Sequence, residues 1–172
     1  MALRFALDPE LTADLRNQLV TLWTDVTNAG GAVGFVAPVT AADVAPQAQG
    51  RCEAISEGRA HLIAGFEDGR LVATAFLTLN NHRLMGHWAW LYTVMVDPAH
   101  QGRGHGAELL REAESAAREL GLEGLRLTCR SGMGLDRFYA SVGYKEVGRT
   151  PGAIRVAAGD DRDEMTMWLP LL

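Results

Sequence analysis

The chain has 172 residues, of which 48% are hydrophobic, and a formal net charge of -5. This length suits a single domain, 1–172, and the absence of any long basic run excludes nucleic acid as an expected partner. Cys52 and Cys129 lack metal-like or redox spacing, so no metal is expected. With no signal pattern and no apolar run of membrane length, the chain is expected to be cytoplasmic and to bind no membrane.

The first third of the chain predicts two helices. Asp8-Pro9, a capping acid followed by proline, is expected to open a helix that ends near Asn28. Its core stripe comprises Leu11, Leu15, Leu19, Leu22, Trp23 and Val26. The apolar, glycine-bearing stretch 32–39 predicts a loop near a pocket mouth. Thr40, with an acid three residues later, resembles a capping box, so a second helix is expected to run to about Ser56.

A hairpin follows the second helix. The runs 61–66 and 70–79 flank Asp68-Gly69, a turn signal between strands. Residues 80–86 form a polar turn that leads into the centre of the chain.

The stretch 88–121 predicts a strand, a glycine loop and a helix. The nearly unbroken apolar run 88–96 favours a strand buried on both faces, which Asp97-Pro98 stops. Gln101-Gly102-Arg103-Gly104-His105-Gly106 comes next. Helical spacing then appears at Leu109, Leu110, Ala113, Ala117 and Leu120. Gly121 stands where a left-handed cap would end this helix.

The order strand, glycine loop, helix is typical of an anion-binding site. Glycines let the backbone approach a phosphate, and the first turn of a helix offers unpaired N–H groups. Arg103 adds a positive charge that can reach the same phosphates. The Lys-Ser or Lys-Thr of a phosphate-loop NTPase is missing, and no acid follows in the place that a dinucleotide-binding fold requires.

Short elements complete the chain. They are a strand at 125–129, a connection at 131–134, a helix at 135–141, a strand at 144–148, an acidic loop at 157–163 and a last strand at 165–169. This order favours an α+β fold with a mixed sheet.

The string V-x-x-x-x-Q-G-x-G-x-G at 96–106 resembles the acetyl-CoA signature of the GCN5-related N-acetyltransferase (GNAT) family. Residues 138–144, F-Y-x-x-x-G-Y, resemble the second landmark of that family. Residues 30–35 and 147–152 are similar to the branch that includes the tabtoxin resistance protein. The resemblance implies the GNAT fold, a mixed, mostly antiparallel sheet flanked by helices. In that fold the central strand splays from its neighbour, and acetyl-CoA lies in the gap.

The resemblance also assigns roles toward acetyl-CoA as co-substrate. The pyrophosphate would be held by Gln101, Gly102, Arg103, Gly104, His105 and Gly106, and the pantetheine arm by Val94, Met95 and Val96. Tyr139 is the candidate general acid that protonates the leaving thiolate.

The acceptor side departs from the branch pattern. Positions that carry acids in the branch are Trp90 and Thr128 here, and Arg130 stands nearby. We therefore expect an acceptor with an anionic group or a weakly basic amine, bound by Trp90, Tyr92, Thr128 and Arg130. The row Trp88, Trp90, Tyr92 fits either core packing or an aromatic wall of the site. The general base stays open among Tyr92, His61, His82, His87 and a chain of waters.

Three functions follow from these expectations. The first is acetyl-CoA-dependent N-acetylation of a primary amine of a small molecule. The second is a non-catalytic acyl-CoA sensor or inactive paralogue, and the third is a protein N-acetyltransferase. The expected partner is a small-molecule amine, and a homodimer is one option for the assembly.

Overall fold

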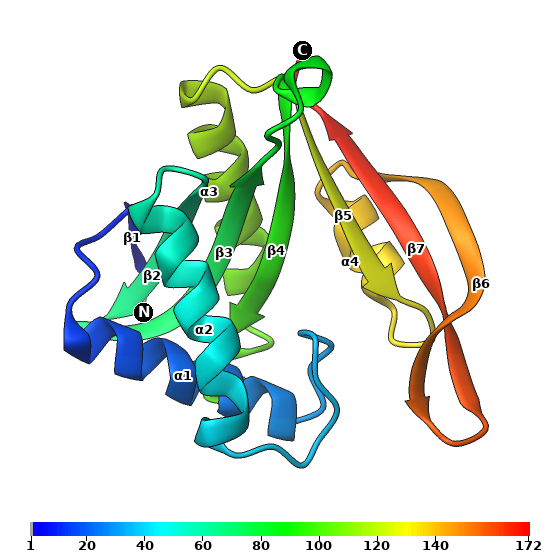
Figure 1. Ribbon diagram of the computed structural model, residues 1–172, viewed down its shortest axis with the longest axis horizontal. Helices are drawn as coiled ribbons and strands as arrows, with labels where there is room; N and C mark the ends of the chain where they lie inside the picture. Colours follow the sequence, from blue (N-terminus) through cyan, green and yellow to red (C-terminus); the bar gives the residue numbers. More distant parts are fainter. Residues whose placement is uncertain (1) are drawn as a thin grey trace.

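The computed structural model describes residues 2–172 and contains one sheet of seven strands and four α-helices (Figure 1). In chain order the elements are β1 (Arg4–Leu7), α1 (Ala13–Asn28), α2 (Ala41–Ser56), β2 (Ala60–Glu67), β3 (Arg70–Leu79), the 3-10 turn η1 (Arg83–Met85), β4 (Trp88–Val96), the 3-10 turn η2 (Pro98–His100), α3 (His105–Glu119), β5 (Gly124–Arg130), α4 (Leu135–Ser141), β6 (Lys145–Ala157) and β7 (Asp160–Pro170).

The strand order in the sheet is β1-β2-β3-β4-β5-β7-β6. All neighbouring strands run antiparallel except β4 and β5, which are parallel. The prediction of a mixed, mostly antiparallel α+β sheet flanked by helices is confirmed.

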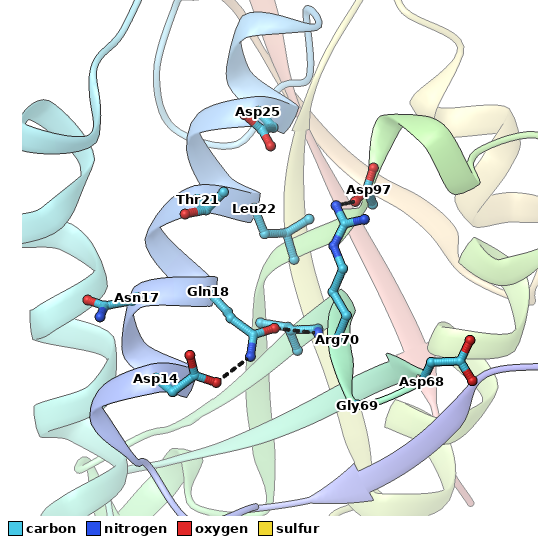
Figure 2. Close-up of a pocket in the computed structure, with 11 residues that line it drawn as sticks. Asp14, Asn17, Gln18, Thr21, Leu22, Asp25, Asp68, Gly69, Arg70 and Asp97 are labelled. Carbon is cyan, nitrogen blue, oxygen red and sulfur yellow. Dashed lines mark hydrogen bonds and ion pairs between the residues drawn. The ribbon is translucent and has the colours of Figure 1, made fainter.

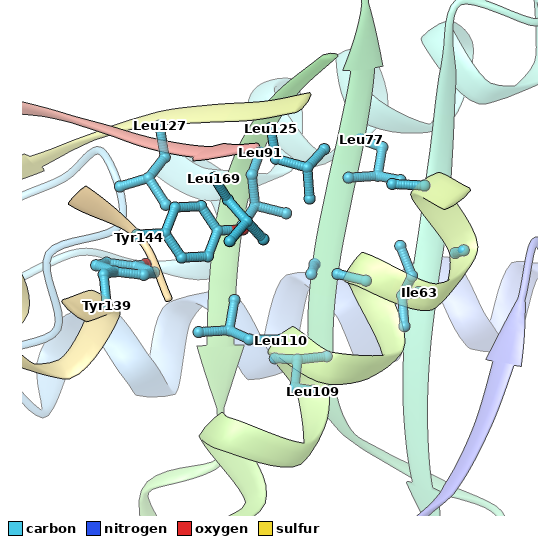
Figure 3. Packing of buried hydrophobic residues seen from close by; sticks show 14 of the residues in the cluster. Ile63, Leu77, Leu91, Leu109, Leu110, Leu125, Leu127, Tyr139, Tyr144 and Leu169 are labelled. Carbon is cyan, nitrogen blue, oxygen red and sulfur yellow. The ribbon is translucent and has the colours of Figure 1, made fainter. Parts of the chain in front are cut away.

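Helices cover both faces of the sheet and enclose two hydrophobic cores. Helices α1 and α2 pack on one face of β2, β3 and β4, whereas α3 and α4 lie on the opposite face (Figure 1). Leu109 and Leu110 of α3 pack with Leu77 and Leu125 in the larger core (Figure 3). The smaller core joins α1 and α2 to the other face of the same strands. Each apolar helix stripe is thereby removed from water.

Strands β4 and β5 pair over a short length and then separate. Their register extends only from Trp88↔Gly124 to Trp90↔Arg126, and the far ends of the two strands diverge (Figure 1). A bulge in the β3–β4 pairing, with Thr93 at φ 51°, turns β4 away at this point. Residues 92–94 are only half-buried, so the prediction of burial on both faces is wrong for this half of the strand.

The N-terminal prediction is wrong at its start. Residues Arg4–Leu7 form an unpredicted edge strand, and α1 begins at Ala13, where the Thr12 hydroxyl accepts a hydrogen bond from the Leu15 N–H. Asp8 has φ 49° and caps nothing, because its carboxylate accepts from the Leu62 N–H and contacts His61. The sequence pattern predicted Asp8 as the helix cap, but its carboxylate instead bonds residues of β2.

The predicted acidic loop at 157–163 is also wrong. Only Ala158 and Gly159 lie between β6 and β7, which form a long hairpin. The acids belong to β7 because they pair with arginines, as in Arg155–Asp161 at 2.7 Å and Arg162–Asp160 at 2.6 Å. The capping box of α2, the β2–β3 hairpin, and helices α3 and α4 are confirmed.

Candidate active site

The turn between β4 and α3 is fixed by Asp97. Its buried carboxylate accepts hydrogen bonds from the Ala99 N–H at 2.9 Å and from the Arg70 guanidinium at 2.6 Å (Figure 2). The Gln101 side chain then donates to the Val96 carbonyl at 3.0 Å. These bonds hold the loop in one shape, so its backbone amides need little reorganisation to meet an anion.

The glycines of this loop have conformations that other residues rarely adopt. Gly102 and Gly104 have φ of 76° and 84°, and no atom lies within 4 Å of where a Cβ at either would stand. Gly104 directly precedes α3, whose first-turn N–H groups point toward the loop. The space and the dipole together suit a pyrophosphate.

Two buried histidines, His100 and His105, flank the glycine loop. His100 bonds Glu67 at 2.5 Å, and His105, the first residue of α3, lies 3.3 Å from the carboxylate of Glu108. Their rings lie 6.4 Å apart and are almost inaccessible to solvent. Both ends of the loop are therefore held by buried histidines that contact carboxylates.

A cleft of about 660 Å³ occupies the gap between β4 and β5. Its lining includes these predicted coenzyme residues: Val94, Met95, Val96, Gln101, Gly102, Gly104, His105 and Gly106. Arg103 lies outside the lining and is exposed. Where β4 leaves β5, its backbone lacks a β5 partner, so a pantetheine arm can pair with the strand end. The residues present therefore fit acetyl-CoA.

A second cavity of about 260 Å³ joins this cleft. The residues shared by the two linings are Ala32, Val33, Val94, Thr128 and Tyr139. The smaller cavity is otherwise lined mainly by Trp23, Phe35, Gln47, Arg51 and Tyr92. The predicted loop at a pocket mouth is confirmed, since Trp23 donates to the Val33 carbonyl at 2.8 Å and packs edge-on against Phe35.

Tyr139 stands where the two cavities meet. Its ring is buried between Phe138 and Tyr144, with centroid distances of 5.2 and 5.6 Å (Figure 3). Burial, and to a lesser extent Cys129, holds the pKa of the Tyr139 phenol well above its ordinary value. Near neutral pH the group is therefore an uncharged O–H that has a proton to give, although the raised pKa makes it a weaker acid than an ordinary phenol.

The aromatic row on β4 divides between core packing and the wall of a cavity. Trp88 is buried in the structure, whereas Tyr92 lines the smaller cavity. The rings of Trp90 and Tyr92 stack at 5.8 Å, and the guanidinium of Arg126 lies 4.8 Å from the Trp90 ring. Thr128 lines both cavities, but Trp90 and Arg130 lie outside the two linings.

A side-chain base does not stand at this junction within residues 2–172. Neither lining contains a carboxylate. His61 is paired with Asp8, His82 caps η1 and His87 is exposed, and none of the three lines either cavity. Burial raises the pKa of Tyr92, which keeps its phenol protonated. An amine entering here is therefore expected to lose its proton to water.

Sequence reasoning missed the residues that α1 and α2 contribute, above all Arg51. A signal was present, because Arg51 lies three residues after Ala48 and seven after Val44, on the stripe that α2 buries. A lone charge on a buried helix stripe indicates either a partner or a ligand.

A separate depression lies between α1 and the β2–β3 hairpin (Figure 2). It holds about 500 Å³ and is lined by the carboxylates of Asp14, Asp25, Asp68 and Asp97, with Arg70 as the single cation among its lining residues. Such a surface repels the phosphates of a nucleotide, so the cleft beside Tyr139 is the better coenzyme site.

Among residues 2–172, no three His, Cys, Asp or Glu side chains come together as metal ligands. No helix in this part of the chain is long and apolar enough to cross a membrane.

A splayed parallel pair with a glycine loop at the start of α3 defines an acyl-CoA-dependent acyltransferase. The family model of the acetyltransferase (GNAT) family matches residues 16–144. The chain belongs to this family of acetyltransferases, whose co-substrate is acetyl-CoA.

Solved structures share the whole fold at low sequence identity. A ribosomal-protein-alanine N-acetyltransferase from Brucella melitensis has a TM-score of 0.77 and 19% identity, with 99% of each chain covered. The yncA protein of Salmonella typhimurium, solved with its cofactor acetyl-CoA, has a TM-score of 0.75 and 18% identity over 98% of this chain and 95% of that one. An N-acetyltransferase from Staphylococcus aureus reaches 0.79 at 14% identity, covering 98% and 99%.

Proposed function

We propose that this protein transfers the acetyl group of acetyl-CoA to a primary amine of a small molecule. The observation that carries the proposal is the junction at Tyr139, where a cleft for the coenzyme meets a cavity of about 260 Å³. A cavity of this size, lined by Trp23, Phe35 and Tyr92, suits a compact acceptor better than a protein surface.

Each side chain has a place in the reaction. Acetyl-CoA supplies a thioester, whose acetyl carbon forms a bond to the amine nitrogen as the bond to sulfur breaks. Backbone N–H groups at Val94–Val96 hold the pantetheine arm, and one of them stabilises the developing negative charge on the thioester oxygen. Tyr139 gives its proton to the departing thiolate, and the amine proton leaves to water.

The proposal also includes the family branch, the compartment and the assembly of the protein. The pattern at residues 30–35 and 147–152 supports the branch that includes the tabtoxin resistance protein. We expect residues 1–172 to act as one domain in the cytoplasm, alone or as a homodimer.

The test is release of free thiol from acetyl-CoA, with the acetylated product identified by mass spectrometry. The acceptors are amino acids, aromatic amines, polyamines and aminoglycosides, set against peptides with free N-termini. The proposal expects product from a small amine and little from the peptides. A peptide as the best acceptor would make the chain a protein acetyltransferase. Tight acetyl-CoA binding without turnover on any amine would make it a sensor.

A further inference from the structure

The smaller cavity contains a cation that has no counter-charge within residues 2–172. Arg51 lines this cavity, and its Nε is buried without a hydrogen-bond partner. No Asp or Glu lines the cavity, and no carboxylate acts on the pKa of Arg51, which burial lowers and Tyr92 raises to a lesser extent. An arginine keeps its charge even so, because its ordinary pKa lies far above neutrality.

An unpaired charge that is partly removed from water is costly, and a bound anion offsets that cost. Arg149 and Arg162 show the usual solution for an arginine, since each bonds a carboxylate. Arg51 instead lies over aromatic rings, 4.7 Å from the Tyr92 centroid and 5.9 Å from that of Phe76. Stacking fixes the plane of the guanidinium and leaves its N–H edge for an anion.

The smaller cavity is lined by both Arg51 and Tyr139. Arg51 comes from α2 and Tyr139 from α4. Strand β4 contributes Tyr92, Thr93 and Val94, where Thr93 has a positive φ. An acceptor of amino-acid size can place an anion at one residue and an amine near the other.

We infer that Arg51 is the anion-binding residue of the acceptor cavity and that the acceptor amine carries a carboxylate. The inference rests on the proposed function, because it names the acceptor of that same site. A carboxylate matches the planar fork of a guanidinium, whereas a polycation meets an uncompensated like charge. Arg51, rather than Arg130, then selects the acceptor, since Arg130 lines neither cavity.

An amino acid and its own carboxamide are the pair of acceptors that tests most directly for recognition of the carboxylate. The two differ only in the carboxylate, and the amide has the less basic amine, so a larger fraction of it is neutral and able to react near neutral pH. Wild type is nevertheless expected to favour the acid by about 10- to 100-fold in kcat/KM, the range of a charge-assisted pair. Arg51→Gln should erase that preference mainly through KM, and Arg51→Lys should keep part of it.

Arg126→Gln is the matched control. Arg126 stacks on the same aromatic row, 4.8 Å from Trp90, and its Nε is likewise buried without a partner, but it lines neither cavity. It should keep the full preference for the acid. Acetyl-CoA affinity and thermal unfolding, measured for every variant, show that Arg51→Gln is folded and loaded. An unchanged preference in Arg51→Gln, or a wild type that favours carboxamides or spermidine, overturns the inference.

Measuring how tightly the acceptor binds tests this inference separately from the proposed function. If no amine is acetylated, the proposed function fails, and calorimetry with coenzyme A present then decides about Arg51. Tighter binding of the amino acid than of its carboxamide in wild type, lost in Arg51→Gln, supports the anion site. Equal binding of the two compounds, or none, overturns it.

Discussion

The ring of Tyr139 meets the ring of Tyr144 edge-on, with centroids 5.6 Å apart. Both rings are buried, but only Tyr139 lines the cavities, and the Tyr144 hydroxyl has no hydrogen-bond partner. The ring of Tyr144 therefore positions the ring of Tyr139, and only the Tyr139 hydroxyl is placed to meet a ligand. This difference gives a matched pair of variants.

Tyr139→Phe should lower kcat and leave the Kd for acetyl-CoA nearly unchanged, because only the hydroxyl is lost. A general acid contributes about 10²- to 10⁴-fold, and a thiolate is a good leaving group, so we expect the low end. Tyr144→Phe should keep wild-type kcat, since it removes an unsatisfied hydroxyl remote from the cavities. Steady-state kinetics under conditions where chemistry limits the rate make the comparison. Equal losses in the two variants would assign Tyr139 a packing role only.

The pH dependence follows from burial, which raises the pKa values of Tyr139 and Tyr144. An ordinary phenol ionises at about pH 10, so the buried O–H of Tyr139 stays protonated beyond that value. Ionisation of Tyr139 should therefore cause no fall in kcat below about pH 10. A descending limb between about pH 8 and 10 that vanishes in Tyr139→Phe would contradict this.

The same shifts affect stability with a definite sign. The folded protein holds two phenolic protons that the unfolded chain loses first, so stability is fully present below about pH 10 and falls as the pH rises above it. Urea unfolding at neutral pH and above pH 10 measures the change. Tyr144→Phe should lessen the alkaline loss.

Gly104→Glu should abolish acetyl-CoA binding, because it blocks the backbone of the loop and places a negative charge at the phosphates. Gly121→Glu is the control: Gly121 has φ 76°, open space around it and a position at the other end of α3. Both variants carry a similar backbone strain of about 1–2 kcal/mol. Calorimetry should find wild-type affinity in Gly121→Glu alone, and equal affinities in both variants would remove the loop from the site.

Gly124→Ala should destabilise the fold by about 1–3 kcal/mol, the usual cost of overpacking. A Cβ at Gly124 would overlap the ring of Trp168, which packs edge-on against Trp88 where β4 and β5 pair. Adding Trp168→Leu should recover part of this loss, since it removes the overlapping ring. Denaturant unfolding of the single and double variants measures the coupling, and purely additive losses would argue against the clash.

The sequence predicted the parts of the fold that local patterns determine. The strand–loop–helix unit at 88–121 and the capping box at Thr40 have short-range causes, and both are present. The strand Arg4–Leu7 was missed because four residues carry no period, and only pairing with β2 makes them a strand. Asp161 and Asp163 of β7 were read as part of a loop because their arginine partners, Arg155 and Arg149, lie on β6.

The lining of the proposed coenzyme cleft was largely predictable, and the lining of the smaller cavity was not. Residues 94–106 are contiguous, so one stretch of sequence carried the signal. The acceptor cavity instead gathers Trp23, Phe35 and Arg51 from separate segments that only the packing of α1 and α2 brings to Tyr139. The predicted Arg130 lies on β5 close to Thr128, whereas Arg51 lies on α2, far from that stretch in the sequence.

The central claim is that the coenzyme lies in the β4–β5 cleft with its sulfur at Tyr139. A crystal structure of the complex with coenzyme A tests it most directly. We expect pantetheine paired with the backbone of Val94–Val96, pyrophosphate at Gly102–Gly106, and sulfur within about 3–3.5 Å of the Tyr139 hydroxyl. A coenzyme bound elsewhere, such as in the depression of Figure 2, or a sulfur remote from Tyr139, would contradict it.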